Sequence, residues 1–118
     1  MDQTTLEIGR VGEDLAQKYL SSLGYKILER NWRKCEIDII AIHLDKIVFI
    51  EVKTRGRNRI EQGEDISHRQ RKRIINAANS YLLKRWEINL ESRFDLVRIR
   101  KTNGDWWVEH IKGAFEVV

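Results

Sequence analysis

The sequence contains no proline and a single cysteine, Cys35, among its 118 residues. One cysteine excludes an intramolecular disulfide framework and a zinc finger built on paired cysteines, and it is typical of a reducing compartment. No apolar run approaches the roughly 20 residues that are needed to cross a bilayer. The first residues carry neither a basic start nor an apolar stretch. We therefore expect no membrane span, no signal peptide and a cytoplasmic location.

Glycine is also sparse, with seven residues, and the sequence shows no linker, repeat or low-complexity segment. A chain of this length forms one domain, so we predict a single domain over residues 1–118. The formal charge of +4 is modest, but the basic excess is concentrated in the middle of the chain. It comprises two clusters: Arg55, Arg57 and Arg59, then Arg69, Arg71, Lys72 and Arg73. Such clustering favours a polyanionic partner, and an ordinary solvated surface is the alternative that charge alone leaves open.

Apolar residues at every third or fourth position predict a helix over residues 6–23, capped by Thr4 or Thr5 and ended by Gly24. A second helix is predicted from Ser67 to about residue 85, after a polar loop over 55–64. Strands are predicted over 25–32, 36–44, 47–53, 93–100 and 105–111, with a turn at Asn103-Gly104. The fold class is therefore α/β, with the order α-β-β-β-α-β-β and a mixed central sheet flanked by helices.

The strands over 36–44 and 47–53 are predicted to form an antiparallel hairpin with a two-residue turn at Asp45-Lys46. In that register Leu44 faces Ile47, Asp38 falls opposite Lys53, and Ile40 falls opposite Glu51. Residues that oppose one another share a face of the sheet, as do residues two apart on one strand. Asp38, Glu51 and Lys53 therefore cluster at the open end of the hairpin, although a slip of one residue would move Asp38 to the opposite face.

The rest of this hairpin is apolar on both faces, as in central strands of a sheet. A charged group at the end of a buried strand is costly unless it is paired or coordinated. Adjacent carboxylates repel each other and attract a hard cation such as Mg²⁺, and a neighbouring lysine can orient an attacking water and stabilise charge on a phosphate. The simpler interpretation is a Glu51–Lys53 ion pair, with Asp38 capping a strand.

Two short motifs resemble a known nuclease signature. Glu36-Ile37-Asp38 followed by Glu51-Val52-Lys53-Thr54-Arg55 resembles the PD-(D/E)xK pattern. The chain as a whole resembles the YraN-like family, a small bacterial group with the restriction-endonuclease-like fold that is similar to archaeal Holliday junction resolvases. The resemblance runs from Gly9-x-x-Gly12-Glu13-x-x-Ala16 through Asn31, the hairpin and the second helix to Arg93-Phe94-Asp95.

This resemblance implies that Asp38 and Glu51 match the metal-binding carboxylates and Lys53 the catalytic lysine. It implies that Glu13 matches a glutamate of the first helix that can complete the metal site. Two positions depart from the family pattern: Cys35 stands where glycine is usual, and Gln70 stands where lysine is common.

From these residues we expect an endonuclease dependent on Mg²⁺ or Mn²⁺ that hydrolyses DNA phosphodiester bonds, in branched or otherwise structured DNA. Its basic clusters would hold the backbone phosphates. A nucleic-acid-binding module with this fold and little turnover is the first alternative, and an interaction protein with a purely structural charged cluster is the second. DNA is favoured over RNA as the partner, and the oligomeric state is open between monomer and homodimer.

Two further patterns bear on the surface. Gly9-Arg10-Val11-Gly12 matches the GXXG loop of KH domains, but too few residues precede it for that fold. We interpret it as a place where the first helix approaches the sheet closely. Trp106 and Trp107 must point to opposite faces if their segment is a strand. Each tryptophan taken singly is expected to pack in the core or on the surface, and the wider face of the strand is left open between a surface for stacking on bases and a dimer contact.

Overall fold

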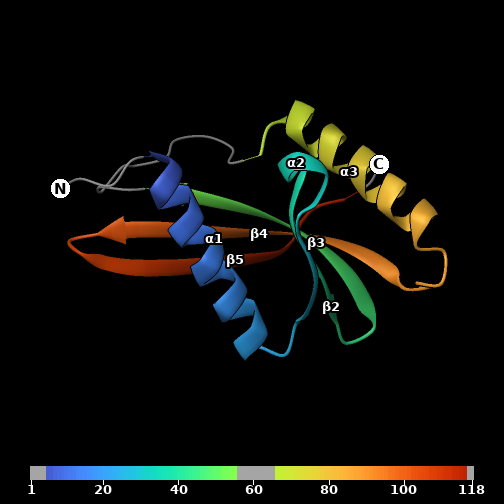
Figure 1. Ribbon diagram of the computed structural model, residues 1–118, viewed down its shortest axis with the longest axis horizontal. Coiled ribbons are helices and arrows are strands. Elements are labelled where there is room, and N and C mark those ends of the chain that lie inside the picture. Colours follow the sequence, from blue (N-terminus) through green and yellow to red (C-terminus); the bar gives the residue numbers. More distant parts are fainter. Residues whose placement is uncertain (1–4, 56–65, 117–118) are drawn as a thin grey trace.

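The computed structural model describes residues 5–55 and 66–116. Five strands form one mixed sheet in the order β1-β2-β3-β4-β5, in which only β3 and β4 run parallel (Figure 1). The elements are α1 (Thr5–Ser22), β1 (Lys26–Asn31), α2 (Trp32–Cys35), β2 (Ile37–His43), β3 (Lys46–Arg55), α3 (His68–Lys84), β4 (Glu91–Thr102) and β5 (Asp105–Phe115). The predicted class and element order are confirmed, except that the one-turn α2 was not predicted and β5 is longer.

The sheet lies between the two long helices, and each helix covers one of its faces. α1 packs Ala16 and Leu20 on a core that includes Ile39, Val48 and Ile50. On the other face, α3 buries Ile74, Ala77, Ala78 and Tyr81 against Ile40, Ile47 and Phe49. The alternation of apolar residues along β2 and β3 therefore supplies both cores, as the sequence predicted for central strands.

Helix α3 begins at a capping box that the sequence partly revealed. The Ser67 hydroxyl accepts a hydrogen bond from the Gln70 backbone N–H, and the Gln70 side chain accepts one from the Ser67 N–H. These bonds satisfy two donors that a helix start leaves unpaired. None of the helices in residues 5–55 and 66–116 is long and apolar enough to span a membrane.

The predicted register of the β2–β3 hairpin is wrong by two residues. His43 pairs with Lys46 and Ile42 with Ile47, so the turn consists of Leu44 and Asp45 rather than Asp45 and Lys46. A shift of two residues keeps every side chain on its predicted face, so apolar alternation alone could not distinguish the two registers. The observed register leaves Lys46 on the strand, where its ammonium group contacts the Glu91 carboxylate at 2.9 Å.

This correction changes which charged residues oppose one another at the open end. Backbone pairing of β2 with β3 includes Ile39 opposite Ile50. The next residues along the two strands, Asp38 and Glu51, therefore face each other, instead of Asp38 facing Lys53. The cluster stays on its predicted side of the hairpin, with its two carboxylates closer together than predicted.

Gly12 is a point of close approach between α1 and the sheet. A Cβ atom built on Gly12 would lie 2.1 Å from the Thr54 Oγ1 atom of β3, whereas one on Gly9 would meet nothing within 4 Å. The interpretation of this glycine pair as a packing device is thus confirmed at Gly12. This contact places the first half of α1, including Glu13, beside the end of β3.

Candidate active site

The Asp38 carboxylate is held in the site by a hydrogen bond from the backbone of the neighbouring strand. The side chain is buried, and its Oδ2 accepts a hydrogen bond from the Val52 backbone N–H at 2.7 Å. A buried N–H on a strand needs an acceptor, and here β2 supplies a side-chain oxygen. Because Val52 is flanked by Glu51 and Lys53, this bond fixes the Asp38 carboxylate beside both of those residues.

Glu51 and Lys53 project from β3 on the same face. The Lys53 Nζ atom lies 3.4 Å from the Glu51 Oε1 atom, and only 16% and 14% of the two side chains are exposed. An ion pair this far from solvent is weakly screened. The structure thus brings together all three residues predicted to be catalytic: Asp38, Glu51 and Lys53.

Burial raises the pKa of both carboxyl groups, and the charge of Glu51 raises that of Asp38 further. Desolvation and the charge of Glu51 raise the pKa of Asp38 from 3.8 to about 8, against the opposing effects of the Val52 N–H and the Lys53 ammonium. Burial also raises the pKa of Glu51, despite its contact with Lys53 and a hydrogen bond with Asp38. At neutral pH the pair therefore retains a proton unless another positive charge lies near.

The donor set of these two residues fits a divalent cation. A hard cation prefers carboxylate oxygens, and its charge would offset the burial and the repulsion from Glu51 that otherwise keep Asp38 protonated. Asp38 and Glu51 would hold the ion, and Lys53 would stand beside it. Across the described residues, however, no group of three or more Asp, Glu, His or Cys side chains is close enough to form a metal site.

Glu13 approaches this pair without joining it. Its charge contributes to raising the pKa of Asp38, so the two carboxyl groups are near one another. The Glu13 carboxylate itself lies 3.4 Å from the Arg30 guanidinium of β1, which also contacts Asp14 at 2.8 Å. Coordination of a metal by Glu13 stays a prediction, and it would require this carboxylate to serve both Arg30 and the metal.

Helix α3 contributes Arg73 to the opposite side of the site. A small cavity of about 90 Å³ is lined by Glu36, Glu51, Gln70, Arg73 and Ile74. The positive charge of Arg73 acts to lower the pKa of Glu51. Gln70, at the position where the resembled family commonly has lysine, is held in the capping box of α3. Arg73 is thus the cation that α3 places beside Glu51.

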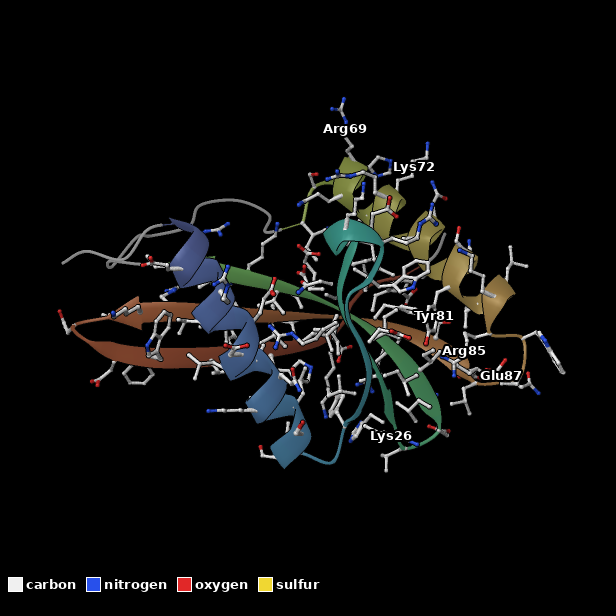
Figure 2. All side chains as sticks on the ribbon, viewed as in Figure 1. Lys26, Arg69, Lys72, Tyr81, Arg85 and Glu87 are labelled. Carbon is white, nitrogen blue, oxygen red and sulfur yellow. The ribbon has the colours of Figure 1, made fainter. Side chains whose placement is uncertain are left out.

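The other predicted phosphate-binding residues of α3 point in different directions. Arg69 and Lys72 project from α3 away from the sheet, whereas Tyr81 of the same helix points toward it (Figure 2). Arg71 donates from Nε to the Ile66 carbonyl at 3.3 Å, and its guanidinium carbon lies 5.9 Å from the Phe115 ring centroid. These two contacts join Arg71 to the segment before α3 and to the end of β5.

Arg55 is the last residue of β3, and its guanidinium donates to the Thr54 carbonyl oxygen at 3.0 Å. Arg57 and Arg59 lie outside the described residues, as does the predicted loop beyond Arg55. The structure therefore places one of the three clustered arginines, directly beyond Lys53 on the same face of the sheet.

Sequence analysis missed a second buried polar cluster, centred on Asp95 of β4. This carboxylate is fully buried and contacts Arg93 Nε at 2.8 Å and His110 Nε2 at 2.7 Å, and it accepts a hydrogen bond from the Gly113 N–H at 3.1 Å. Burial acts to raise the pKa of Asp95, but the bonds from His110 and Arg93 outweigh it, and the pKa is lowered. The cluster lies on the face covered by α1, at the level of Ile50.

Two tyrosines close this cluster on the side of α1 and β1. The Tyr25 hydroxyl accepts a hydrogen bond from Arg93 Nη2 at 2.5 Å, and its ring stacks on His43 with a 4.0 Å centroid separation. The Tyr19 hydroxyl lies 3.1 Å from His110 Nδ1. The pairing of β4 with β5 brings His110 and Gly113 to Asp95, and the packing of α1, β1 and β2 on the same face adds Tyr19, Tyr25 and His43. The one local signal was a charged Arg-x-Asp within an otherwise apolar strand.

Comparison with known proteins gives a consistent result along the chain. The model of a family described as "Uncharacterised protein family UPF0102" matches residues 12–99. This chain belongs to the UPF0102 family. UPF0102 proteins from Syntrophotalea carbinolica and Bacteroides thetaiotaomicron are 40% and 39% identical to it over 120 and 112 residues. These alignments cover 99% and 92% of this chain, and 98% and 92% of the relatives.

A UPF0102 protein from Persephonella marina is 42% identical over 112 residues, which cover 92% of this chain and 93% of that protein. The residues matched by the UPF0102 model include Glu13 and Asp38, and also Glu51, Lys53 and Arg73. The candidate active site therefore lies within the part of the chain that defines the family. The outer part of the β4–β5 hairpin lies beyond that match.

Proposed function

We propose that this protein is a metal-dependent endonuclease that hydrolyses phosphodiester bonds of DNA, with branched or otherwise structured DNA as its substrate. The observation that carries the proposal is the pair of opposed carboxylates, Asp38 and Glu51, with the Lys53 ammonium 3.4 Å from Glu51. Two adjacent carboxylates with raised pKa values are typical of functional sites rather than of surface ion pairs. The resemblance to the PD-(D/E)xK signature and to the restriction-endonuclease-like fold supports the same assignment.

Hydrolysis forms a bond between a water oxygen and phosphorus, while the bond from phosphorus to one sugar oxygen breaks. Bound to Asp38 and Glu51, a Mg²⁺ or Mn²⁺ ion would supply Lewis-acid stabilisation of the charge that develops on the phosphate. Lys53 would orient the attacking water and donate hydrogen bonds to the phosphate oxygens. The Val52 N–H keeps the Asp38 carboxylate in place, and Arg73 and Arg55 lie where they can attract the backbone.

The second candidate is a nucleic-acid-binding module with little turnover. One observation favours it: the described residues provide two carboxylates at the site, because Glu13 is paired with Arg30. A site with fewer ligands binds its cation more weakly, whereas the basic residues around it would still attract phosphates. Binding and cleavage must therefore be measured separately.

The chain contains its own control for a cleavage experiment. Asp45, Lys46 and Glu91 form a second Asp/Lys/Glu ion-pair cluster at the other end of the same hairpin, where the side chains of Asp45 and Glu91 are 84% and 83% exposed. Asp38→Asn, Glu51→Gln and Lys53→Ala are thus matched in chemistry by Asp45→Asn, Glu91→Gln and Lys46→Ala. All six variants and the parent are purified in parallel, so that a contaminating nuclease would appear equally in every preparation.

Labelled linear duplex, single-stranded and four-way-junction DNA are incubated with Mg²⁺, Mn²⁺ or chelator. We expect cleavage by the parent in metal only, with a loss of about two orders of magnitude or more in the three site variants and none in their controls. Equal activity of site and control variants would show that the cleavage does not arise at this site. An inactive parent that still binds DNA would support the binding module instead.

A further inference from the structure

On the face of the sheet that carries Glu51, the side chains of the neighbouring strands β3 and β4 change from apolar to basic just beyond Glu51. On β3, the buried Phe49 is followed at alternate positions by Glu51, Lys53 and Arg55. On the parallel strand β4, the buried Leu96 is followed by Arg98 and Arg100, and the register places Lys53 beside Arg98 and Arg55 beside Arg100. The basic rows therefore begin at the candidate active site and run outward from it.

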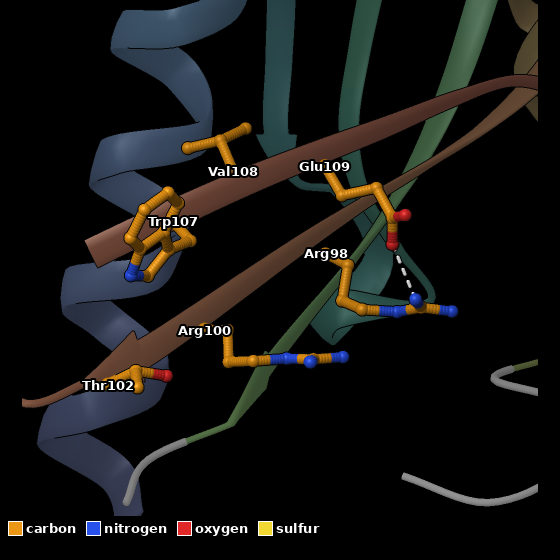
Figure 3. A pocket seen from close by; sticks show the side chains of 6 residues that line it. All are labelled: Arg98, Arg100, Thr102, Trp107, Val108 and Glu109. Carbon is orange, nitrogen blue, oxygen red and sulfur yellow. Dashed lines mark hydrogen bonds and ion pairs between the residues drawn. The ribbon is translucent and has the colours of Figure 1, made fainter. Parts of the chain in front are cut away.

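Strand β5 extends these rows and ends them with an aromatic ring. Arg98 pairs with Glu109 across the strands, and Arg100 pairs with Trp107. Figure 1 shows that the β4–β5 hairpin extends away from α3, which covers the apolar part of this face. The extended part forms an open groove of about 700 Å³, lined by Arg98, Arg100, Thr102, Trp107, Val108 and Glu109 (Figure 3).

Trp107 differs from its neighbour Trp106 in exposure. Trp106 packs partly buried on the α1 side of the sheet, with the Lys101 ammonium 5.4 Å from its ring centroid. Trp107 points to the opposite face, as predicted for adjacent residues of a strand, and 62% of it is exposed. A large exposed indole contributes little to the fold, and beside cations it offers a surface on which a nucleic-acid base can stack.

The groove contains two arginines, of which, among the described residues, Arg98 is ion-paired and Arg100 is not. The Glu109 carboxylate forms an ion pair with the Arg98 guanidinium, which fixes its orientation (Figure 3). Arg100 forms no ion pair with any of the described residues, so its charge is not neutralised within the groove. An anion entering beside Trp107 would meet the Arg100 guanidinium first.

We propose that this groove binds a single-stranded segment of nucleic acid, with a base stacked on Trp107 and a phosphate on Arg100. The assignment to a single strand follows from stacking, because a base inside a duplex already has both faces covered by its neighbours. The proposal rests on the proposed function for its direction: the segment leads away from the scissile phosphate at Asp38 and Glu51. Arg100 lies beside Arg55, which is four residues beyond Glu51 on β3. The groove and the paired carboxylates are therefore about 13 Å apart at the usual strand rise.

Binding is measured in chelator, where no cleavage occurs, by fluorescence anisotropy of labelled oligothymidylate, oligouridylate and blunt duplex DNA. Trp107→Ala should weaken binding of the single strands by about 5- to 150-fold, the range for loss of one stacking platform. Trp107→Phe should restore most of that loss, and Arg100→Ala should flatten the dependence of log affinity on log salt by about 0.7. Blunt duplex binding should change less than twofold with Trp107→Ala. The thymidylate and uridylate arms distinguish DNA from RNA.

Trp86→Ala is the matched control, because Trp86 is 84% exposed and lies in the segment after α3, away from the groove. Equal single-strand affinity for Trp107→Ala, Trp86→Ala and the parent would overturn the proposal, as would a parent that binds no single strand. So would sedimentation in which Trp107→Ala converts a dimer to a monomer without changing oligonucleotide affinity. Cleavage by the parent and loss of cleavage in Asp38→Asn would in that case leave the proposed function intact.

Discussion

The Asp38 carboxylate and the Val52 main chain are joined by a hydrogen bond in which the Val52 N–H donates to Oδ2 over 2.7 Å. This bond ties the buried Asp38 side chain to the backbone of the sheet. An asparagine at this position retains an acceptor oxygen for the N–H but carries no titratable group. Asp38→Asn therefore separates the structural contribution of residue 38 from the contribution of its charge.

The first prediction concerns the pH dependence of stability. The pKa of Asp38 is about 8 in the folded chain against 3.8 unfolded, so between these values the folded state holds a proton that the unfolded state has released. The free energy of unfolding should therefore fall as pH rises from about 4 to about 8, by an amount on the order of a few kcal/mol. In chelator, Asp38→Asn should remove this fall, so its advantage over the parent in melting temperature should grow with pH.

Asp45→Asn serves as the control, because Asp45 lies in the exposed turn of the same hairpin. Its melting temperature should follow that of the parent at every pH. A parent whose stability rises from pH 5 to pH 8, with Asp38→Asn running parallel to it, would contradict a protonated Asp38 in the folded chain.

The second prediction concerns metal binding, measured without any substrate. Mn²⁺ or Mg²⁺ bound to the folded chain should raise the melting temperature, by the equivalent of about 2.7 kcal/mol at a hundredfold excess over Kd. The rise should be larger at pH 8 than at pH 5, because the ion has to displace the proton of Asp38. Asp38→Ala should abolish the rise and Glu91→Gln should retain it. Calorimetry that gives Asp38→Ala the same Mn²⁺ affinity as the parent would refute the assignment.

Most of the fold, and the clustering of Asp38, Glu51 and Lys53 at the open end of the hairpin, could be predicted from the sequence. Apolar periodicity gave the helices and strands, because burial on two faces constrains every position of β2 and β3. The hairpin register could not be predicted fully, because a shift of two residues preserves every face assignment. Its turn carries Leu44 at φ 55°, a conformation that its sequence does not signal.

The residues that sequence analysis missed depend on contacts between distant segments. Arg98 and Arg100 join the basic rows only through the parallel pairing of β3 with β4, and no local pattern encodes that register. The Asp95 cluster likewise requires His110 to arrive from β5. Within the second basic cluster, nothing in the sequence distinguishes Arg71 from Arg73, and their different contacts follow from the packing of α3.

The third prediction concerns the two glycines of α1. Gly12→Ala should destabilise the fold by about 1–3 kcal/mol, because its Cβ would overlap the Thr54 side chain. Gly9→Ala should instead stabilise it by about 0.5–1 kcal/mol, because an alanine there loses less backbone entropy on folding and meets no neighbour. Urea unfolding measures both changes. Equal effects of the two substitutions would show that α1 does not approach β3 at Gly12.

The fourth prediction concerns the buried cluster around Asp95. Asp95→Ala should cost about 3–5 kcal/mol at neutral pH, because it leaves the Arg93 guanidinium without its buried partner. Since the pKa of Asp95 is lowered, this contribution is present above about pH 4 and is lost as pH falls through the folded-state pKa. Glu91→Ala, which breaks an exposed pair with Lys46, should cost far less, because solvent screens that pair. Similar losses in the two variants would mean that the Asp95 cluster contributes no more than a surface ion pair.

The last prediction separates two arginines that are two residues apart on α3. Arg73 lies beside Glu51 in the cavity of the candidate site, whereas Arg71 is engaged by the Ile66 carbonyl and the Phe115 ring. Each phosphate contact on duplex DNA contributes about −0.9 to the slope of log affinity against log salt. Arg73→Ala should therefore flatten this slope by about 0.9 for duplexes of any sequence, because phosphate contacts carry no sequence information. Arg71→Ala should lower the melting temperature and leave the slope unchanged. The reverse pattern would mean that the nucleic acid approaches α3 from the side of Phe115, away from the paired carboxylates.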